Sequence, residues 1–435
     1  MMPANRGRAS TYALIFGVLL VCVALFVSGI GSNIARSATQ SLNEKSVTFQ
    51  RQVAQTAAQV IVDPQPAVVA PSVAHVPTPT PVKAIYMSEC AVGTPSLRDN
   101  LVKLIDDTEL NAVVIDIKDY TGKLSFTPDD PSLADSVSSA CGATDMKEFI
   151  QKLHDKNIYV IGRITTFQDP YYTKLHPDLA VKLVSNHDGV WKDNKGLAFI
   201  DVGAKPYWDY LIKIATSSYA VGFDELNFDY IRFPSDGPMK DAYYSWDQGQ
   251  DKPEALEHFY QYLNQHLKPQ GIVMSADLFG MVSTNYDDLN IGQVLERALP
   301  YFDFIDPMVY PSHYPSGFHG YAKVNDHAYD IVQFSMSQAV KRTIATTTSI
   351  GSLAYTRIGS STPALYEKPS YPASKMRPWL QSFDYPVTYT ADMVAQQIKA
   401  NTDAGLDSYL FWDPANKYRS LREVLTAASA TTTAE

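Results

Sequence analysis

Eight short apolar segments recur along this chain of 435 residues and alternate with amphipathic segments. The short segments have the apolar runs or the period-two alternation of strands, whereas those between them have the three-to-four-residue spacing of helices. Repeated strand–helix units predict parallel strands joined by right-handed crossovers. The predicted strands are VKAIYMSE, NAVVIDIKD, NIYVIGRIT, GFDELNFDYIRFP, GIVMSADLFG, FDFIDPMVYP, RPWLQSF and DSYLFWDP.

Eight such units can form either a (β/α)8 barrel or an open doubly wound sheet. An open sheet would bind a nucleotide through a glycine-rich first turn, and neither G-x-G-x-x-G nor a P-loop follows the first predicted strand. We therefore predict a (β/α)8 TIM barrel over residues 83–424 and a flexible tail at 425–435.

The N-terminal region has a different composition. Two arginines precede an uncharged apolar run at residues 12–30, whose length is close to the roughly 20 residues that span a bilayer. Residues 1–31 are predicted to be a cytoplasmic stub and a single-pass anchor in the cell membrane, with the barrel on the extracytoplasmic side. The alternative is a signal peptide cleaved near Arg36, which would give a secreted protein. Residues 32–82, which end in a proline–threonine spacer, are predicted to be a disordered linker.

Charge and cysteine content restrict the partners of the protein. A net charge of −10 argues against binding to nucleic acid, which needs a basic surface. Cys90 and Cys141 fall in loops at one end of the predicted barrel, where they form either a disulfide in an oxidising compartment or two free thiols. No Cys-x-x-Cys motif or Cys/His cluster indicates a metal site. We expect neither a metal nor a cofactor.

The fourth predicted strand, within residues 222–237, is the strongest indication of a functional site. Its polar residues share one face: Glu225, Asn227 and Asp229. Buried carboxylates are costly unless they are paired or hydrogen-bonded, so a chain that points several of them inward usually uses them. We expect Glu225 to lie deeper in the barrel and to form an ion pair with Lys118 or Arg163.

Functional side chains of a (β/α)8 barrel lie at the carboxyl ends of its strands. We expect the following residues there to bind substrate: Asp116, Lys118, Arg163, Tyr230, Arg232, Tyr310, His313, Trp379, Gln381 and Trp412. Carboxylates beside cationic and aromatic side chains suit cleavage of a glycosidic bond. That reaction needs one carboxylic acid to protonate the leaving oxygen and one carboxylate as nucleophile or base, and aromatic faces can hold the sugar.

Asp229 and Asp277 come from adjacent predicted strands, so their carboxyl groups can face each other across a cleft. We predict that they are the catalytic acid/base pair, that Arg232 keeps one of them ionised, and that Asp306 is a reserve catalytic carboxylate. Each also has a structural alternative: an Asp229–Arg232 ion pair that closes the barrel, a loop cap at Asp277 and a turn acceptor at Asp306.

These segments together resemble a known family. GFDELNFDYIRFP, with VVIDIKD, YVIGRIT, SADLFG, PMVYPSHY, RPWLQSF and LFWDP, is similar to the bacterial "putative glycoside hydrolase" TIM-barrel domain over residues 83 to about 420. The resemblance implies a (β/α)8 fold, export and a role on cell-surface or extracellular polysaccharide. The residues that match its motifs are Asp229, Tyr230-Ile231-Arg232-Phe233-Pro234, Asp277, His313, Trp379 and Gln381.

The chain departs from the family pattern at two places. About thirty residues, 347–376, are inserted before the seventh predicted strand, and we expect them to form a loop over the cleft. That strand carries Gln381 where many retaining barrel glycosidases have a glutamate, which argues against a mechanism that pairs strands four and seven. The alternative to a glycosidase is a non-catalytic glycan-binding barrel of the cell envelope. A metal-dependent deacetylase would need clustered ligands, and His313 and His319 alone do not supply them.

Overall fold

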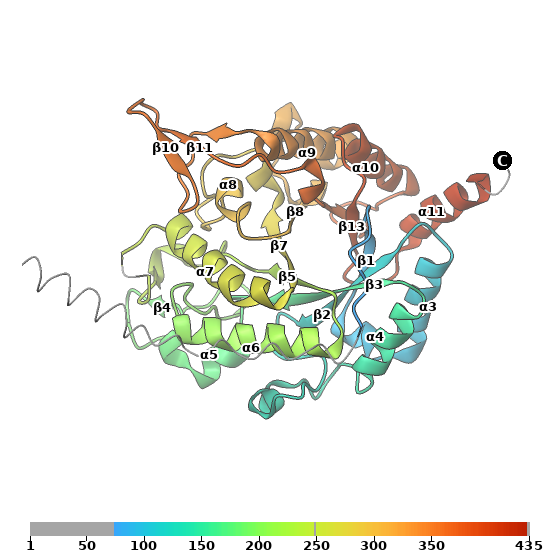
Figure 1. Cartoon of the computed structure of the whole chain (residues 1–435), viewed down its shortest axis with the longest axis horizontal. Helices are drawn as coiled ribbons and strands as arrows, with labels where there is room; N and C mark the ends of the chain where they lie inside the picture. The colour runs from blue at the N-terminus through green and yellow to red at the C-terminus, as the bar shows by residue number, and fades with distance from the viewer. Residues whose placement is uncertain (1–73, 248, 433–435) are drawn as a thin grey trace, which may run out of the picture. The chain divides into compact units, whose positions relative to one another are not determined.

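The computed structural model of the protein describes residues 74–247 and 249–432. Eight parallel strands close into a barrel in the order β1-β13-β12-β8-β7-β5-β3-β2 (Figure 1). The strands are β1 Lys83–Met87, β2 Ala112–Lys118, β3 Tyr159–Thr165, β5 Glu225–Asp229, β7 Val273–Phe279, β8 Phe304–Met308, β12 Trp379–Gln381 and β13 Tyr409–Trp412. Each predicted strand contains one of them, so the predicted (β/α)8 barrel is confirmed.

Helices follow the strands along the chain and cover the outside of the barrel (Figure 1). The longer helices are α3 Pro95–Asp106, α4 Met146–His154, α6 Lys205–Val221, α7 Lys252–Leu267, α9 Ala328–Ile344, α10 Ala391–Asp403 and α11 Arg419–Thr432. The short ones are α2 Glu89–Val92, α5 Pro170–Leu175 and α8 Leu295–Ala298, and two short strands, β4 Lys182–Leu183 and β6 Ala242–Tyr243, pair outside the barrel.

Apolar side chains form two separate layers because the strands alternate inward and outward residues. The outer layer joins strands to helices, with Val113, Ile115 and Ile117 of β2 among its members. The other face of β2 starts with Ala112 and Val114, which belong to a smaller cluster inside the barrel. The same inward face continues to Asp116, and the register of β2 against β3 shifts between Asp116 and Lys118. The inward face of β2 therefore changes from apolar to charged toward the carboxyl end of the strand.

Residues 74–82, the end of the predicted disordered linker, are bound to the barrel. The N–H of Val76 donates to Oδ1 of Asp224 at 2.8 Å, and the hydroxyls of Thr78 and Tyr159 lie 2.9 Å apart. The linker prediction is wrong for this part, because composition alone does not show that the barrel offers a carboxylate and a hydroxyl to the segment.

Two other terminal predictions concern the anchor and the tail. Residues 12–30, the predicted anchor, lie outside the described residues, and no helix within 74–247 and 249–432 has the length and apolarity needed to cross a bilayer. The predicted tail is wrong up to residue 432, because α11 continues to Thr432 and Leu425 packs in the core.

The inserted segment 347–376 forms a small antiparallel sheet that extends from one side of the barrel (Figure 1). Its strands are β9 Thr347–Thr348, β10 Thr356–Ile358 and β11 Leu365–Glu367. The N–H of Leu353 donates to Glu257 on α7 at 2.8 Å, and the hydroxyl of Tyr355 donates to the carbonyl of Glu296 on α8 at 2.6 Å. Contrary to our expectation, none of these residues lines the cavity described below, because polar groups of α7 and α8 hold the segment.

Cys90 on α2 and Cys141 in the loop before α4 form a disulfide, with their Cα atoms 4.7 Å apart. The bond joins residues that are 51 positions apart. We expect the double variant Cys90→Ser/Cys141→Ser to lower the free energy of unfolding by about 2–4 kcal/mol, because the unfolded chain loses a loop constraint. Urea denaturation followed by circular dichroism measures this change.

Reduction provides the control for the disulfide. Dithiothreitol should lower the stability of the unmodified protein to that of the double variant and leave the variant unchanged. A variant as stable as the oxidised protein would contradict the prediction.

Candidate active site

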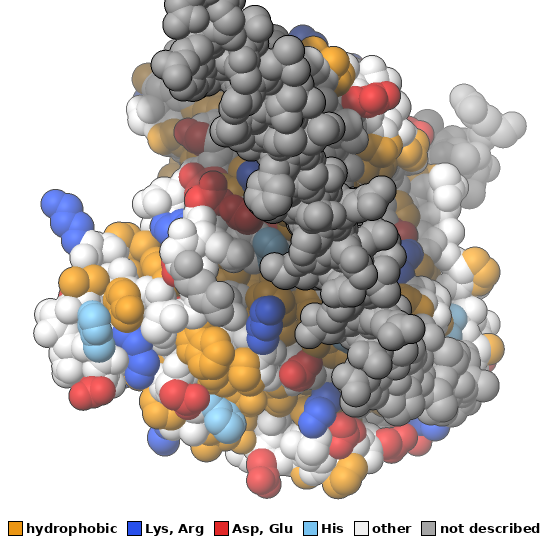
Figure 2. Space-filling model, turned by 60° about the vertical axis from the view of Figure 1, so that its left-hand side comes forward, with side chains coloured by type: hydrophobic (Ala, Val, Ile, Leu, Met, Phe, Trp, Pro, Cys, Tyr) orange, Lys and Arg blue, Asp and Glu red, His pale blue; other side chains and the backbone are white. Residues whose placement is uncertain are grey.

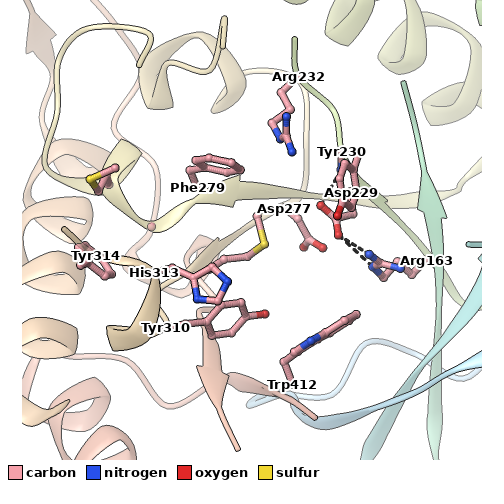
Figure 3. A pocket seen from close by; sticks show the side chains of 13 residues that line it. Arg163, Asp229, Tyr230, Arg232, Asp277, Phe279, Tyr310, His313, Tyr314 and Trp412 are labelled. Carbon is pink, nitrogen blue, oxygen red and sulfur yellow. Dashed lines mark hydrogen bonds and ion pairs between the residues drawn. The ribbon is translucent and has the colours of Figure 1, made fainter. Parts of the chain in front are cut away.

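A cavity of about 310 Å³ lies at the carboxyl ends of β3, β5, β7, β8 and β13, within the size range of ligand pockets (Figure 3). The predicted residues that line it are Arg163, Asp229, Tyr230, Arg232, Asp277, Tyr310, His313 and Trp412. The predicted residues that do not are Asp116, Lys118, Asp306, Trp379 and Gln381. Residues that the sequence reasoning did not assign to the site also line it: Phe279, Gly280, Met281, Met308 and Tyr314.

Arg163 on β3 holds the carboxylate of Asp229, which ends the neighbouring strand β5. Its Nε donates to Oδ2 of Asp229 at 3.1 Å, and its Nη2 donates to the same oxygen. Nη1 of Arg163 donates to Oδ1 of Asp116 at 2.6 Å. The prediction that Arg232 pairs with Asp229 is wrong, because Arg163 lies beside Asp229 on the adjacent strand whereas Arg232 lies beyond the end of β5.

The chain turns sharply just after Asp229. Tyr230 has a φ of 49°, in the left-handed region that aromatic residues rarely adopt. This turn lets the backbone N–H of Tyr230 donate to Oδ1 of Asp229 at 2.5 Å. A left-handed residue other than glycine is less stable by roughly 1–2 kcal/mol, and such strain tends to concentrate at functional sites.

Asp116 and Lys118 support the site without lining the cavity. Asp116 lies between Arg163 and the hydroxyl of Tyr86, which donates to its Oδ2 at 2.5 Å. Lys118 is fully buried and forms an ion pair with Asp169 at 2.9 Å. Both were predicted to contact substrate, but each faces protein groups that fix the ends of β2 and β3.

Asp277 on β7 points toward Asp229 in the cavity (Figure 3). Its Oδ1 accepts hydrogen bonds from Nδ2 of Asn227 at 2.8 Å and from Nε1 of Trp379 at 2.7 Å. Burial raises the pKa of Asp277 well above its ordinary value, and the negative charges of Asp229 and Asp306 add to this effect. The acid form is therefore favoured. Because Oδ1 accepts two N–H groups, the proton belongs on Oδ2.

Arg377, which directly precedes the Pro378 before β12, joins Asp306 and Glu225 inside the barrel. Its Nε and Nη2 each donate to Asp306 at 3.0 Å, and its Nη1 donates to Glu225 at 3.0 Å. All three side chains are fully buried. The structure thus places Asp306 in an ion pair instead of at the cavity. The predicted interior ion pair of Glu225 is confirmed, but its partner is Arg377 and neither Lys118 nor Arg163.

Trp379 and Gln381 of β12 are buried, and each acts on the site through another residue. Trp379 is 1% exposed, so its ring cannot bind substrate as predicted; its indole N–H instead donates to Asp277. The side-chain oxygen of Gln381 accepts from the N–H of Ser312 at 3.2 Å. Gln381 therefore fixes the loop that carries His313 to the cavity wall.

The walls of the cavity are largely aromatic. Trp412 stacks on Tyr86 with 3.9 Å between ring centroids, and the guanidinium of Arg163 lies 4.9 Å from the Trp412 ring. His313 bonds to the hydroxyl of Ser312 at 2.8 Å, and burial lowers its pKa. The neutral imidazole is therefore favoured, which suits a hydrogen-bonding wall.

Apolar lining residues were missed because they resemble core residues in the sequence. Phe279 could have been assigned to the cavity from the sequence, because it follows Asp277 by two positions and so lies on the same face of β7. Gly280 could not, because the need for glycine there comes from residues that are distant in the sequence. A Cβ at Gly280 would lie 2.5 Å from the hydroxyl of Tyr314 and from the carbonyl oxygen of Met308.

Within residues 74–247 and 249–432, no group of three or more His, Cys, Asp or Glu side chains is arranged to hold a metal ion.

The comparisons with known proteins give one match to a protein family and several to solved structures. The chain matches the sequence model of the family described as "Putative glycosyl hydrolase domain" over residues 84–418. A hypothetical protein from Ruminiclostridium thermocellum is 34% identical over 48% of this chain and 98% of its own, with a TM-score of 0.40. No curated protein matches the chain.

Two more distant structures share the fold. The glycoside hydrolase domain of PgaB (BpsB) from Bordetella bronchiseptica is 13% identical, with a TM-score of 0.53 over 79% of this chain and 99% of its own. Alpha-L-fucosidase isoenzyme 2 from Paenibacillus thiaminolyticus is 11% identical, with a TM-score of 0.51 over 81% of this chain and 50% of its own. At these identities the likeness shows the barrel fold alone.

The family match rests on the amino-acid sequence and not on the fold alone. It extends from β1 to the loop before α11 and includes every residue that lines the cavity. The chain therefore belongs to the family described as "Putative glycosyl hydrolase domain".

Proposed function

We propose that this barrel is a glycoside hydrolase acting on extracellular or cell-envelope polysaccharide. In this proposal Asp277 is the general acid and Asp229 is the nucleophile or general base. The observation that carries the proposal is that two carboxyl groups from neighbouring strands line one cavity in opposite environments. A guanidinium binds Asp229, whereas burial raises the pKa of Asp277. Glycosidic cleavage requires such a difference between two carboxyl groups.

The reaction follows from the hydrogen bonds of each carboxyl group. Oδ2 of Asp277 donates its proton to the glycosidic oxygen while the bond from that oxygen to the anomeric carbon breaks. Asp229 either attacks the anomeric carbon or takes a proton from the water that attacks it. As Asp277 becomes negative, the N–H groups of Asn227 and Trp379 stabilise its new charge, because hydrogen bonds to an ionised acceptor are stronger.

The surroundings of the two carboxyl groups support a sugar ligand. Trp412, Tyr310 and Phe279 give the cavity the aromatic surface on which sugar rings pack. Acidic and basic side chains are interspersed on the described surface visible in Figure 2, and no continuous basic patch is visible there for nucleic acid. We further propose that the barrel is exported by way of the apolar run at 12–30. The Cys90–Cys141 disulfide supports this location, because such bonds persist in oxidising compartments.

The role of Asp277 can be tested through the leaving group. For Asp277→Asn we expect kcat/KM to fall about 10²–10⁴-fold on an alkyl glycoside, whose alcohol must be protonated as it leaves. The loss should be much smaller on the matched p-nitrophenyl glycoside, because p-nitrophenolate leaves without a proton. In the unmodified protein the rate should fall as pH rises through the pKa of Asp277, since only the acid form donates. The variant should lack this alkaline limb.

The controls separate catalysis from folding. Asp99→Asn, at an exposed position on α3, should leave both rates and the pH profile unchanged. Equal losses on the two substrates would exclude Asp277 as the acid. Binding of glycans without any product from the unmodified protein would instead support the non-catalytic glycan-binding barrel.

A further inference from the structure

Arg232 differs from the other buried cations that the structure describes. It is 7% exposed, and within residues 74–247 and 249–432 it has one hydrogen bond, from Nη1 to the carbonyl of Phe233 at 2.9 Å, and no ion pair. Lys368, also without an ion pair, donates to two backbone carbonyls. The remaining buried cations each have a carboxylate partner: Arg98, Lys118, Arg163, Arg342 and Arg377.

The edge of the Arg232 guanidinium that has no hydrogen bond to a described residue, formed by Nε and Nη2, lies at the cavity. Arg232 lines the cavity together with Asp229 and Asp277, and its guanidinium points toward them in Figure 3. The rings of Phe279 and Tyr230 lie 4.8 Å and 5.0 Å from the guanidinium carbon and hold it in place without using an N–H group. Nε and Nη2 have no hydrogen-bond partner in the described part of the chain, and one N–H group of each forms the fork that binds a carboxylate through two hydrogen bonds.

The charge of Arg232 is also available to a ligand. The carboxylates that act on it electrostatically are Asp229, Asp236 and Asp193, but none forms an ion pair with it. Asp229 is already held by Arg163. A buried guanidinium without an anion is unfavourable, and its attraction for one is stronger in a low-dielectric wall than in water. A site for a neutral sugar needs only uncharged donors at this position.

We propose that the cavity binds an acidic sugar and that Arg232 binds the carboxylate of this sugar. The catalytic part of this inference rests on the proposed function; the recognition part does not. In a uronic acid the carboxylate is attached to the ring carbon on the far side of the ring oxygen from the anomeric carbon. Because Arg232 lines the same cavity as Asp229 and Asp277, a sugar held by Arg232 through its carboxylate can present its anomeric carbon to these two carboxyl groups.

The test compares matched sugars that differ in one group. The probes are the methyl glucuronides and galacturonides, in both anomers, and the corresponding methyl glucosides and galactosides, in which a hydroxymethyl group replaces the carboxylate. Binding is measured by calorimetry on the full-length Asp277→Asn protein. This substitution suppresses turnover of alkyl glycosides, whose alcohol must be protonated as it leaves, and it adds no cation to the cavity.

We expect at least one uronide to bind about tenfold or more tightly than its neutral counterpart, as hydrogen bonds between charged groups allow. Adding Arg232→Gln to this protein should reduce the ratio of the uronide affinity to the neutral-sugar affinity to about one. Arg232→Lys keeps the charge but loses the fork, so it should retain only part of the preference. Arg357→Gln, at an exposed position in the inserted sheet, should leave the ratio unchanged.

Several outcomes would overturn the inference. They are equal affinity within every pair, a uronide preference that survives Arg232→Gln, no binding of any probe, or tighter binding of a 6-sulfated glycoside than of the uronide. If Arg232→Gln does not fold, as judged by near-ultraviolet circular dichroism, an undiminished preference in Arg232→Lys overturns it. A uronide preference without cleavage by the unmodified protein rejects only the proposed function. Cleavage of neutral glycosides without a uronide preference rejects only the acidic-sugar inference.

Discussion

Replacing Asp229 with asparagine is expected to lower kcat by at least about 10³-fold on alkyl and p-nitrophenyl glycosides alike, whereas Asp277→Asn should affect mainly the alkyl substrate. An amide can neither attack the anomeric carbon nor accept the proton of a water molecule. The substitution also removes the carboxylate that accepts two hydrogen bonds from Arg163, so among the described residues this guanidinium keeps Asp116 alone as its ion-pair partner. The measurement is kcat on the glycan or p-nitrophenyl glycoside that the unmodified protein cleaves.

Two further measurements make the Asp229 prediction specific. Asp99→Asn is the matched control, because it makes the same chemical change at an exposed position. Sodium azide should restore turnover of Asp229→Asn and release a glycosyl azide if Asp229 is a nucleophile, since the azide ion takes its place at the anomeric carbon. Circular dichroism confirms folding before rates are compared. Equal product from Asp229→Asn and the unmodified protein would remove Asp229 from the mechanism.

Local pattern was sufficient to predict the barrel. Each strand carries its own signal, because an inward residue must alternate with an outward one, and β2 shows this with Val113 and Ile115 against Val114. The order of the strands follows from right-handed crossovers.

The position of Asp229 and Asp277 at the cavity also follows from local pattern, but the residues that form hydrogen bonds with them do not. Arg232 follows Asp229 by three positions, yet the left-handed turn at Tyr230 takes it out of the strand. Arg163 is distant in sequence, and the pairing of β3 with β5 brings it beside Asp229. Such pairings depend on the register between strands, which no local pattern contains.

Strand position also separates two tryptophans that look equivalent in the sequence. Trp412 lines the cavity, whereas Trp379, on the adjacent strand β12, is buried and donates to Asp277. In the register of the barrel Trp379 pairs with Leu410, two residues before Trp412. The stagger of the strands therefore decides which ring reaches the cavity, and it is a property of the closed barrel as a whole.

Loss of Arg377 has the largest expected effect on stability. We expect Arg377→Met to lower the free energy of unfolding by about 3–5 kcal/mol, because it leaves Glu225 and Asp306 buried without a cation. Hydrogen bonds from Ser275 to Glu225 at 2.6 Å and from Asn227 to Asp306 at 3.2 Å remain and offset part of this loss. Urea denaturation at several pH values measures the effect.

The sign of the pH dependence follows from Asp306. Burial raises the pKa of Asp306 to about 6, even though Arg377 lowers it. Between about pH 4, the pKa in an unfolded chain, and about pH 6, the folded protein binds more protons than the unfolded chain. Stability from this group therefore falls as pH rises through that window. Without Arg377 the pKa of Asp306 should rise further, so the deficit of Arg377→Met should be larger at pH 8 than at pH 5.

A charge-free version of the cluster distinguishes the ion pair from simple packing. In Glu225→Gln/Asp306→Asn/Arg377→Met the buried charges are absent together, and we expect most of the lost stability to return and the added pH dependence to disappear. An Arg377→Met protein whose free energy of unfolding at pH 8 is within about 0.5 kcal/mol of that of the unmodified protein would contradict the prediction.

The activity of the triple variant should respond differently from its stability. Asn227 donates to both Asp306 and Asp277, so the stable triple variant should still have an altered pH profile, because the charge of Asp306 no longer acts on the pKa of Asp277.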